Sequence, residues 1–179
     1  PGDDAAVIRS RADGVLLLAA DAVLPVLIER DPFRAGRAVV LVNVNDVYAM
    51  GGRPLALVSV LAGLTEAAER EVCRGIREEC RRLGVPLVGG HVSPEGDAPF
   101  LAAGILGEAR SLLADGNARP GQTILLAMDL RGERWGDYLL NWDSHRAKDR
   151  QTLTADLEVL CGLAEEGLAA AAKDVSNAG

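Results

Sequence analysis

The sequence predicts an α+β fold in which a mixed or antiparallel β-sheet is backed by two long helices. Two short apolar runs, 5–10 and 15–20, are separated by Ala12-Asp13-Gly14, a sequence typical of a β-hairpin turn. Segments with helical periodicity follow at about 34–50 and 66–83. Strands alternating with helices would also suit a doubly wound parallel sheet, but an N-terminal hairpin argues against that fold.

The first long helix is expected to open at Asp31-Pro32, because proline suits the first helical position. Gly51-Gly52 provide its C-terminal stop, and Pro54 follows. The segment is apolar on nearly every side, so we expect this helix to be buried.

The remaining elements are predicted from caps, apolar runs and turn residues. Thr65 is a plausible N-cap for the second helix, and Gly84 ends it. The expected strands are 55–61, 87–91, 100–106 and 123–128, with a turn over 117–121, a polar connection over 131–150 and a helix over 153–172.

Acidic residues occur at four positions with apolar or small neighbours, where an unpaired carboxylate is costly. They are Asp3, Asp4, Asp21 and Asp46. Two carboxylates about 4 Å apart repel by about 4 kcal/mol at a dielectric constant near ~20. A divalent cation removes this penalty, and oxygen ligands without a Cys/His cluster favour Mg²⁺ over Zn²⁺. Asn43 lies one helical turn from Asp46, which makes this face a candidate site; the alternative is a structural, hydrogen-bonded Asp46.

The composition narrows the function classes. A formal net charge of −7 argues against general nucleic-acid binding. No apolar run of about 18 residues and no signal peptide is visible, so we expect no membrane partner. The three cysteines form no CxxC pair, which fits a reduced, cytoplasmic protein.

Several motifs occur in an order that resembles one superfamily. They are Asp31 to Arg37, Asn45 to Gly52, Gly89-Gly90-His91, Ala118 to Gln122, and Lys173 to Ser176. Together they resemble the amino-terminal domain of aminoimidazole ribonucleotide (AIR) synthetase-like, or PurM-like, proteins. This superfamily includes selenophosphate synthetase and thiamine-monophosphate kinase. The resemblance covers nearly the whole chain, and the stretch 142–179 is most similar to the AIR synthase-related branch.

The resemblance implies a metal site and a nucleotide site. In the superfamily, aspartates hold Mg²⁺ on the phosphates of ATP, and two amino-terminal domains pair their sheets across a homodimer. The implied metal positions are Asp4, Asp21 and Asp46, with Asp174 as a fourth and Asp3 as a further candidate. The implied nucleotide positions are Asn43, Gly89, Gly90 and His91, with a structural hydrogen bond as the alternative for His91.

Simple chemistry agrees with this assignment. Glycines allow backbone N–H groups to approach phosphate closely, and Mg²⁺ held by few carboxylates keeps coordination positions for phosphate oxygens. No GxxxxGK[ST] sequence occurs, so the site is not a P-loop.

The chain departs from the superfamily pattern at both ends. Relatives carry a glycine-rich loop before the Gly-Asp-Asp motif, with a catalytic Lys or Cys in selenophosphate synthetase, so no catalytic residue can be assigned here. We expect a segment upstream of Pro1 and a truncated C-terminal domain. The predicted organisation is an ATP/Mg-binding domain over 1–130, followed over 131–179 by a connection, a helix and the start of that second domain.

The leading functional hypothesis is the amino-terminal half of an ATP- and Mg²⁺-dependent enzyme that activates an unidentified small substrate by phosphoryl transfer. The alternative is a non-catalytic nucleotide-binding or dimerisation module of a larger protein. The scarcity of lysine, with only Lys148 and Lys173 present, favours the alternative.

Overall fold

A computed structural model describes residues 3–9, 14–134 and 142–175. Five strands form one sheet in the order β1-β2-β5-β3-β4. Their bounds are β1 Ala6–Arg9, β2 Val15–Ala22, β3 Arg53–Ala62, β4 Leu87–Ser93 and β5 Phe100–Ala109. Only the β3–β4 pair is parallel among these strands, and the other pairs are antiparallel. The mixed sheet confirms the predicted α+β class, and β1 with β2 confirms the hairpin, although Ala12 and Asp13 of its turn lie outside the described residues.

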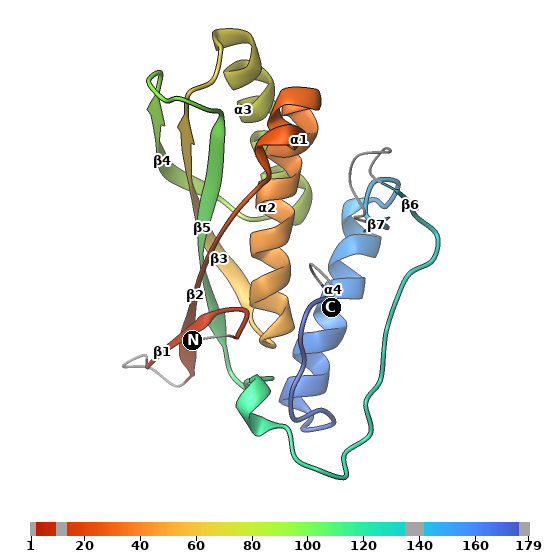
Figure 1. The fold of residues 1–179 in the computed structure, drawn as a ribbon. Coiled ribbons are helices and arrows are strands. Elements are labelled where there is room, and N and C mark those ends of the chain that lie inside the picture. The colour runs from red at the N-terminus through yellow and green to blue at the C-terminus, as the bar shows by residue number, and fades with distance from the viewer. Residues whose placement is uncertain (1–2, 10–13, 135–141, 176–179) are drawn as a thin grey trace.

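Helices lie on one side of this sheet (Figure 1). They are α1 Pro25–Arg30, α2 Pro32–Ala49 and α3 Glu66–Leu83, and the last two confirm the predicted pair of helices. The Asp31 carboxylate caps α2 by accepting a hydrogen bond from the Arg34 backbone N–H at 2.9 Å. Thr65 caps α3 in the same way, through the Ala68 N–H at 3.3 Å. The short helix α1 was not predicted.

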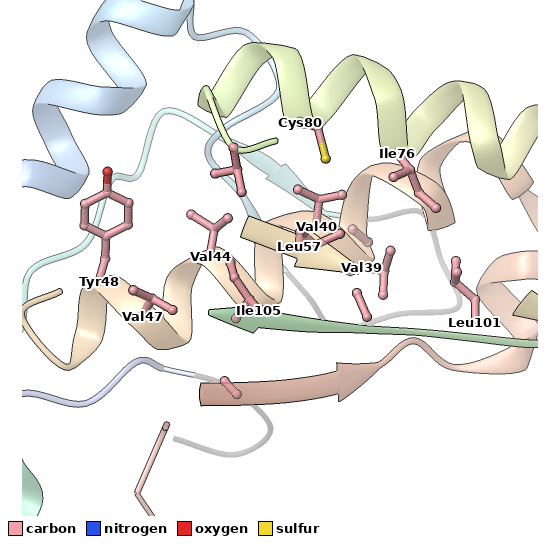
Figure 2. Close-up of a cluster of buried hydrophobic side chains, with 14 of the residues drawn as sticks. Val39, Val40, Val44, Val47, Tyr48, Leu57, Ile76, Cys80, Leu101 and Ile105 are labelled. Carbon is pink, nitrogen blue, oxygen red and sulfur yellow. The ribbon is translucent and has the colours of Figure 1, made fainter. Parts of the chain in front are cut away.

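The hydrophobic core lies between α2 and the sheet (Figure 2). Val39, Val44 and Val47 of α2 are fully buried, as are Leu57 of β3 and Ile105 of β5. β-branched residues supply most of the helix side of this core, and their stiff side chains pack well against a pleated sheet. The burial fixes α2 against β2 and β5, which is what positions the candidate site.

A fourth helix, α4 Arg150–Glu165, lies beyond α2 as seen from the sheet (Figure 1). It begins and ends earlier than the predicted 153–172 helix. Gly167 has φ +68°, and the Gly167 and Leu168 N–H groups donate to Ala164 and Leu163 carbonyls, which closes the helix in a Schellman motif.

The predicted strand at 123–128 is wrong. This segment follows the 3₁₀ turn Asp115–Asn117 and is extended, but it pairs with no other described strand. Its apolar side chains are exposed, with Ile124 at 95% and Leu125 at 88%. A strand requires a hydrogen-bonded neighbour, and the pattern of side chains alone does not supply one. In the described residues of the polar connection after it, 131–134 and 142–150, the strands β6 Glu133–Arg134 and β7 Trp142–Asp143 pair as a short antiparallel ribbon.

Candidate functional site

Asp21 and Asp46 are brought together by the packing of β2 against α2. Asp21 follows Leu17 and Ala19 on the side of β2 that faces the helices. The Asn43 side-chain oxygen accepts a hydrogen bond from the Asp21 backbone N–H at 3.2 Å, and its amide donates to the Val39 carbonyl at 2.8 Å. Asn43 is fully buried, so it joins the end of β2 to α2 one turn before Asp46.

The segment after α4 brings two more charged residues to the same place. Arg53 at the start of β3 anchors α4 through ion pairs to Glu158 at 2.8 Å and Glu165 at 2.6 Å. Past the end of α4, the Ala172 backbone N–H donates to the Leu113 carbonyl at 3.0 Å. The next two residues, Lys173 and Asp174, therefore lie beside the N-terminal segment.

Asp4 is the point where the N-terminal segment and this tail meet. One carboxylate oxygen of Asp4 forms an ion pair with the Lys173 ammonium group. Its other oxygen accepts a hydrogen bond from the Asp174 backbone N–H at 3.3 Å. The Asp4 side chain is only 3% exposed, whereas that of Lys173 is 50% exposed. We call Asp4, Asp21, Asp46 and Asp174 the acid cluster.

Electrostatic coupling shows that the members of the acid cluster are close enough to affect one another. Burial, together with the charges of Asp174, Asp21 and Asp4, raises the pKa of Asp46 to about 7 against the opposing effect of Lys173. Burial and the neighbouring Asp4 also raise the pKa of Asp174. The hydrogen bond to Asp4 raises the pKa of Lys173, which favours its charged form.

The acid cluster suits a Mg²⁺ ion that takes some of its ligands from water and phosphate better than it suits a metal whose ligands all come from the protein. All four of its side chains offer oxygen, the ligand type that Mg²⁺ prefers. Within the described part of the chain, no group of three or more acidic, histidine or cysteine side chains is arranged so that it could hold a metal ion by itself. Mg²⁺ commonly uses one or two carboxylates and takes its other ligands from water and phosphate, so an incomplete protein set suits it.

Asp3 has a different environment from the acid cluster. Its carboxylate accepts hydrogen bonds from the Asp4 N–H at 3.0 Å and the Asp115 N–H at 3.1 Å. These bonds join the N-terminal segment to the 3₁₀ turn and give Asp3 a structural task. A metal-binding role for Asp3 remains a prediction.

The glycines and histidine predicted to contact nucleotide lie at the opposite edge of the sheet. Gly89, Gly90 and His91 are on β4, three strands away from β2, which corresponds to ~14 Å at the usual strand spacing. A Cβ atom at Gly90 would lie 2.3 Å from the Ser59 carbonyl oxygen, so close packing explains this glycine. Within one chain, this edge and the acid cluster are separate.

Two features were missed from the sequence. Lys173 lies in no glycine-rich loop, so the sequence does not mark it, although it directly precedes Asp174 of the acid cluster. Glu79 is buried between Arg37 at 2.7 Å and Arg82 at 2.6 Å, and it joins α3 to α2. The sequence does not indicate that Glu79 is buried, because its charged neighbours make it look like part of a solvent-exposed helix face.

Comparison with known proteins identifies relatives of this fold and site. An uncharacterised protein of Synechocystis sp. is 38% identical over 178 residues, which cover 99% of this chain and 55% of that protein. A selenide, water dikinase of Pseudomonas aeruginosa is 32% identical, over 72% of this chain and 38% of the relative. The chain thus spans about half, or less, of the length of these relatives.

A solved structure shares the architecture. The Aquifex aeolicus thiamine monophosphate kinase AaThiL, in complex with AMPPCP and TMP, matches with a TM-score of 0.61 at 25% identity. The match covers 66% of this chain and 40% of that structure.

The sequence profile described as "AIR synthase related protein, N-terminal domain" matches residues 2–109. These residues contain the five-stranded sheet, helices α1 to α3, and three of the four members of the acid cluster. The chain therefore belongs to the AIR synthase-related family, within the PurM-like superfamily, and residues 2–109 match the N-terminal domain of that family.

Proposed function

We propose that this chain is the amino-terminal half of an ATP- and Mg²⁺-dependent enzyme that activates a small substrate by phosphoryl transfer. The observation that carries the proposal is the acid cluster itself. Four carboxylates from the N-terminal segment, β2, α2 and the tail meet at one place, and the pKa of Asp46 is raised to about 7. Such repulsion between neighbouring acids, three of them partly buried, is typical of a site completed by a cation.

In this proposal one or two carboxylates of the acid cluster hold Mg²⁺, Asp46 among them, and Asp21, Asp4 and Asp174 are the candidates for the other. The bound ion would neutralise charge on the phosphates of ATP and fix their orientation. The γ-phosphorus loses its bond to the β,γ-bridging oxygen, which leaves with ADP, and gains a bond to the acceptor nucleophile, whose proton passes to solvent or a base. The residues of this chain position the phosphates and exclude water, because phosphoryl transfer depends mainly on positioning and charge.

The relatives support ATP as the nucleotide of this chain, but they do not identify the phosphoryl acceptor. AaThiL was solved with AMPPCP, an ATP analogue, and with TMP, and another relative is a selenide, water dikinase. These two acceptors differ in chemistry, so the acceptor of this chain stays open. The Gly89 to His91 edge, whose backbone is exposed, is proposed to contact the nucleotide only when a second chain brings it to an acid cluster.

We further propose a homodimer formed through the sheet face that the helices leave open. On this face Ile8, Leu18, Val58, Val60 and Phe100 are each 40–48% exposed. A contiguous apolar sheet face of this kind favours a second apolar face as its partner, and a second copy supplies one with matching geometry. The barrel formed by paired sheets in the superfamily supports the same arrangement.

The setting of the proposed enzyme follows from simpler features. In the described part of the chain, none of the helices combines the length and hydropathy needed to cross a membrane. A net charge of −7 disfavours nucleic acid as a partner. Three free cysteines, of which Cys80 and Cys161 are buried, suit the reducing cytoplasm that we propose as its location.

Calorimetry of AMPPCP binding to the full-length protein, with Mg²⁺ and then with excess EDTA, tests the proposal. We expect binding with Mg²⁺ and a loss of at least about tenfold in affinity without it. Equal binding in both conditions would show that the acid cluster holds no metal, and no binding in either would remove ATP from the proposal. ATP turnover by the same protein would separate the enzyme from a module that only binds nucleotide.

A further inference from the structure

Lys173 is the one ammonium group at the acid cluster among the described residues. The only other lysine, Lys148, is held by Asp129 at 2.8 Å and Asp156 at 2.6 Å, away from the cluster. Lys173 bonds to an oxygen of Asp4, whose side chain is almost completely buried. The ammonium therefore occupies a position where a positive charge is needed, while half of its own side chain remains in solvent.

The Lys173–Asp4 contact conflicts with metal binding at the same atom. One oxygen of Asp4 is used by the ammonium, and the other accepts the Asp174 backbone N–H. The +1 charge on the first oxygen opposes a divalent cation at that oxygen, because two cations repel at contact distance. Loading the site with metal therefore favours movement of Lys173 away from Asp4.

The surroundings of Lys173 determine where it can move. It lies on an irregular segment four residues past Ala169, where the chain has left the end of α4, and its flexible four-carbon stem is half-exposed. The acidic side chains beside it would be neutralised by the metal. The strongest remaining anion for a displaced ammonium is the phosphate chain of the nucleotide that the metal binds.

We propose that Lys173 is a phosphate-contacting residue of this site, which neutralises Asp4 in the empty protein and transfers to the nucleotide phosphates when Mg²⁺-nucleotide binds. The inference rests on the proposed function. In this proposal a lysine outside any glycine-rich loop contacts the phosphates. The segment that follows α4 is then part of the nucleotide site.

If Lys173 moves from Asp4 to the phosphates, removing its charge should change the Mg²⁺ affinity and the AMPPCP affinity in opposite directions. A purely structural ion pair would not produce this combination. Lys173→Met keeps the length of the stem and removes the charge. In the full-length protein we expect the affinity for Mg²⁺ alone to rise by about threefold or more, since a competing cation is gone. We expect the affinity for AMPPCP in saturating Mg²⁺ to fall by about tenfold, since a charged phosphate contact is lost. Lys173→Arg, which keeps the charge, should retain most of the AMPPCP affinity.

Both affinities are measured by calorimetry, with thermal unfolding as a check on the fold and Lys148→Met as the matched control that should change neither affinity. Tighter Mg²⁺ binding together with weaker AMPPCP binding in Lys173→Met supports the proposal. If both affinities stay unchanged, or both shift in the same direction, Lys173 is only a structural or competing charge and the proposal is overturned. If wild-type protein binds neither Mg²⁺ nor AMPPCP, the proposed function fails as well, and that result differs from a failure confined to Lys173.

Discussion

The two sides of the sheet carry the two halves of the predicted site, and they are built in different ways. On the β2 side, next to the edge strand β1, side chains from four separate parts of the chain converge, and each depends on tertiary packing for its place. At the β4 edge, Gly89, Gly90 and His91 are consecutive on one strand and present mainly backbone. The acid cluster is charged and partly buried, whereas all three residues of the β4 edge are exposed.

The difference indicates that a single chain assembles the acid cluster, which we propose as the metal-binding part of the site, without the β4 part. In the acid cluster the carboxylates lie close enough to interact, and the Asn43 side chain accepts a hydrogen bond from the Asp21 backbone N–H. Lys173 supplies a positive charge through its ion pair with Asp4. The β4 edge has no comparable partner among the described residues. If both edges contact one nucleotide, as the resemblance implies, then a second chain or a further domain must bring them together.

The largest effect is expected at Asp46. Asp46→Asn keeps the shape of the side chain and removes its charge, so we expect Mg²⁺-dependent AMPPCP binding to fall by about 100-fold or more while the fold is retained. Calorimetry and circular dichroism measure the two properties.

A matched control for Asp46 is Asp97→Asn in the loop between β4 and β5. Asp97 is exposed, and its side chain forms no ion pair or hydrogen bond with the described part of the chain. This control should be silent; Asp13, in the hairpin turn, lies outside the described residues and is less informative. Wild-type affinity in Asp46→Asn, or unfolding of that variant, would make Asp46 a structural acid.

The pH dependence of binding tests the acid cluster through Asp46. The pKa of Asp46 is about 7, and a metal requires the carboxylate form. AMPPCP affinity in Mg²⁺ should therefore fall by about tenfold per pH unit below pH ~7, and calorimetry between pH ~5 and ~8 measures it. A flat profile over this range would place the metal elsewhere.

The stability of the metal-free protein should change with pH in the opposite direction. The pKa of Asp46 is higher in the folded protein than its usual value of 3.8, so the folded state binds the proton more tightly. The resulting stability is present below pH ~4 and is lost as pH rises through about 7. Allowing for solvent screening, we expect a loss of ~1–2 kcal/mol, absent in Asp46→Asn, in urea unfolding at pH 5 and pH 8.

Glycine substitutions test the β4 edge at a smaller scale. A Cβ atom at Gly90 would lie 2.3 Å from the Ser59 carbonyl, whereas at Gly89 the nearest atom, a Val58 methyl, is 3.9 Å away. Gly90→Ala should lower the free energy of unfolding by ~1–3 kcal/mol, and Gly89→Ala should leave it nearly unchanged. If Gly89→Ala nevertheless weakens AMPPCP binding, that edge contacts nucleotide; an unaltered affinity would restrict the site to the acid cluster.

The smallest effect is expected at His91. Its side chain is exposed and forms no hydrogen bond or ion pair with the described residues. His91→Ala should therefore change stability by less than about 0.5 kcal/mol, as measured by urea unfolding. A larger loss would reveal a structural hydrogen bond, and a selective loss of AMPPCP affinity would assign His91 to the nucleotide.

Local sequence signals predicted the fold well wherever a cap or a periodic pattern fixed an element. Asp31, Thr65 and Gly84 set the ends of α2 and α3, and each makes the cap that its residue type suggests. The strand at 123–128 failed because strand formation depends on a partner, which no local pattern reports. The helix end at Glu165 was missed because Gly167 lies within a run of residues that all favour helix.

The residues of the candidate site could be predicted from the sequence, but the contacts between distant parts of the chain that bring them together could not. Burial of acids in apolar sequence pointed to Asp21 and Asp46, whose proximity follows from one strand packing on one helix. The contact between Asp4 and Lys173 joins positions 169 residues apart, and it depends on where α4 lies. That position is set by Arg53 with Glu158 and Glu165, charged residues that look like ordinary surface positions in the sequence.

The central claim is that the acid cluster holds the metal of a metal-nucleotide complex. A crystal structure of the full-length protein with Mn²⁺ in place of Mg²⁺ and with AMPPCP tests it most directly, because Mn²⁺ is located by its anomalous scattering. The account predicts an anomalous peak bound to carboxylate oxygens of Asp46 and at least one other member of the acid cluster, with phosphate oxygens completing its coordination. A Mn²⁺ peak bound only elsewhere, with the Lys173–Asp4 pair intact beside a bound nucleotide, would contradict it.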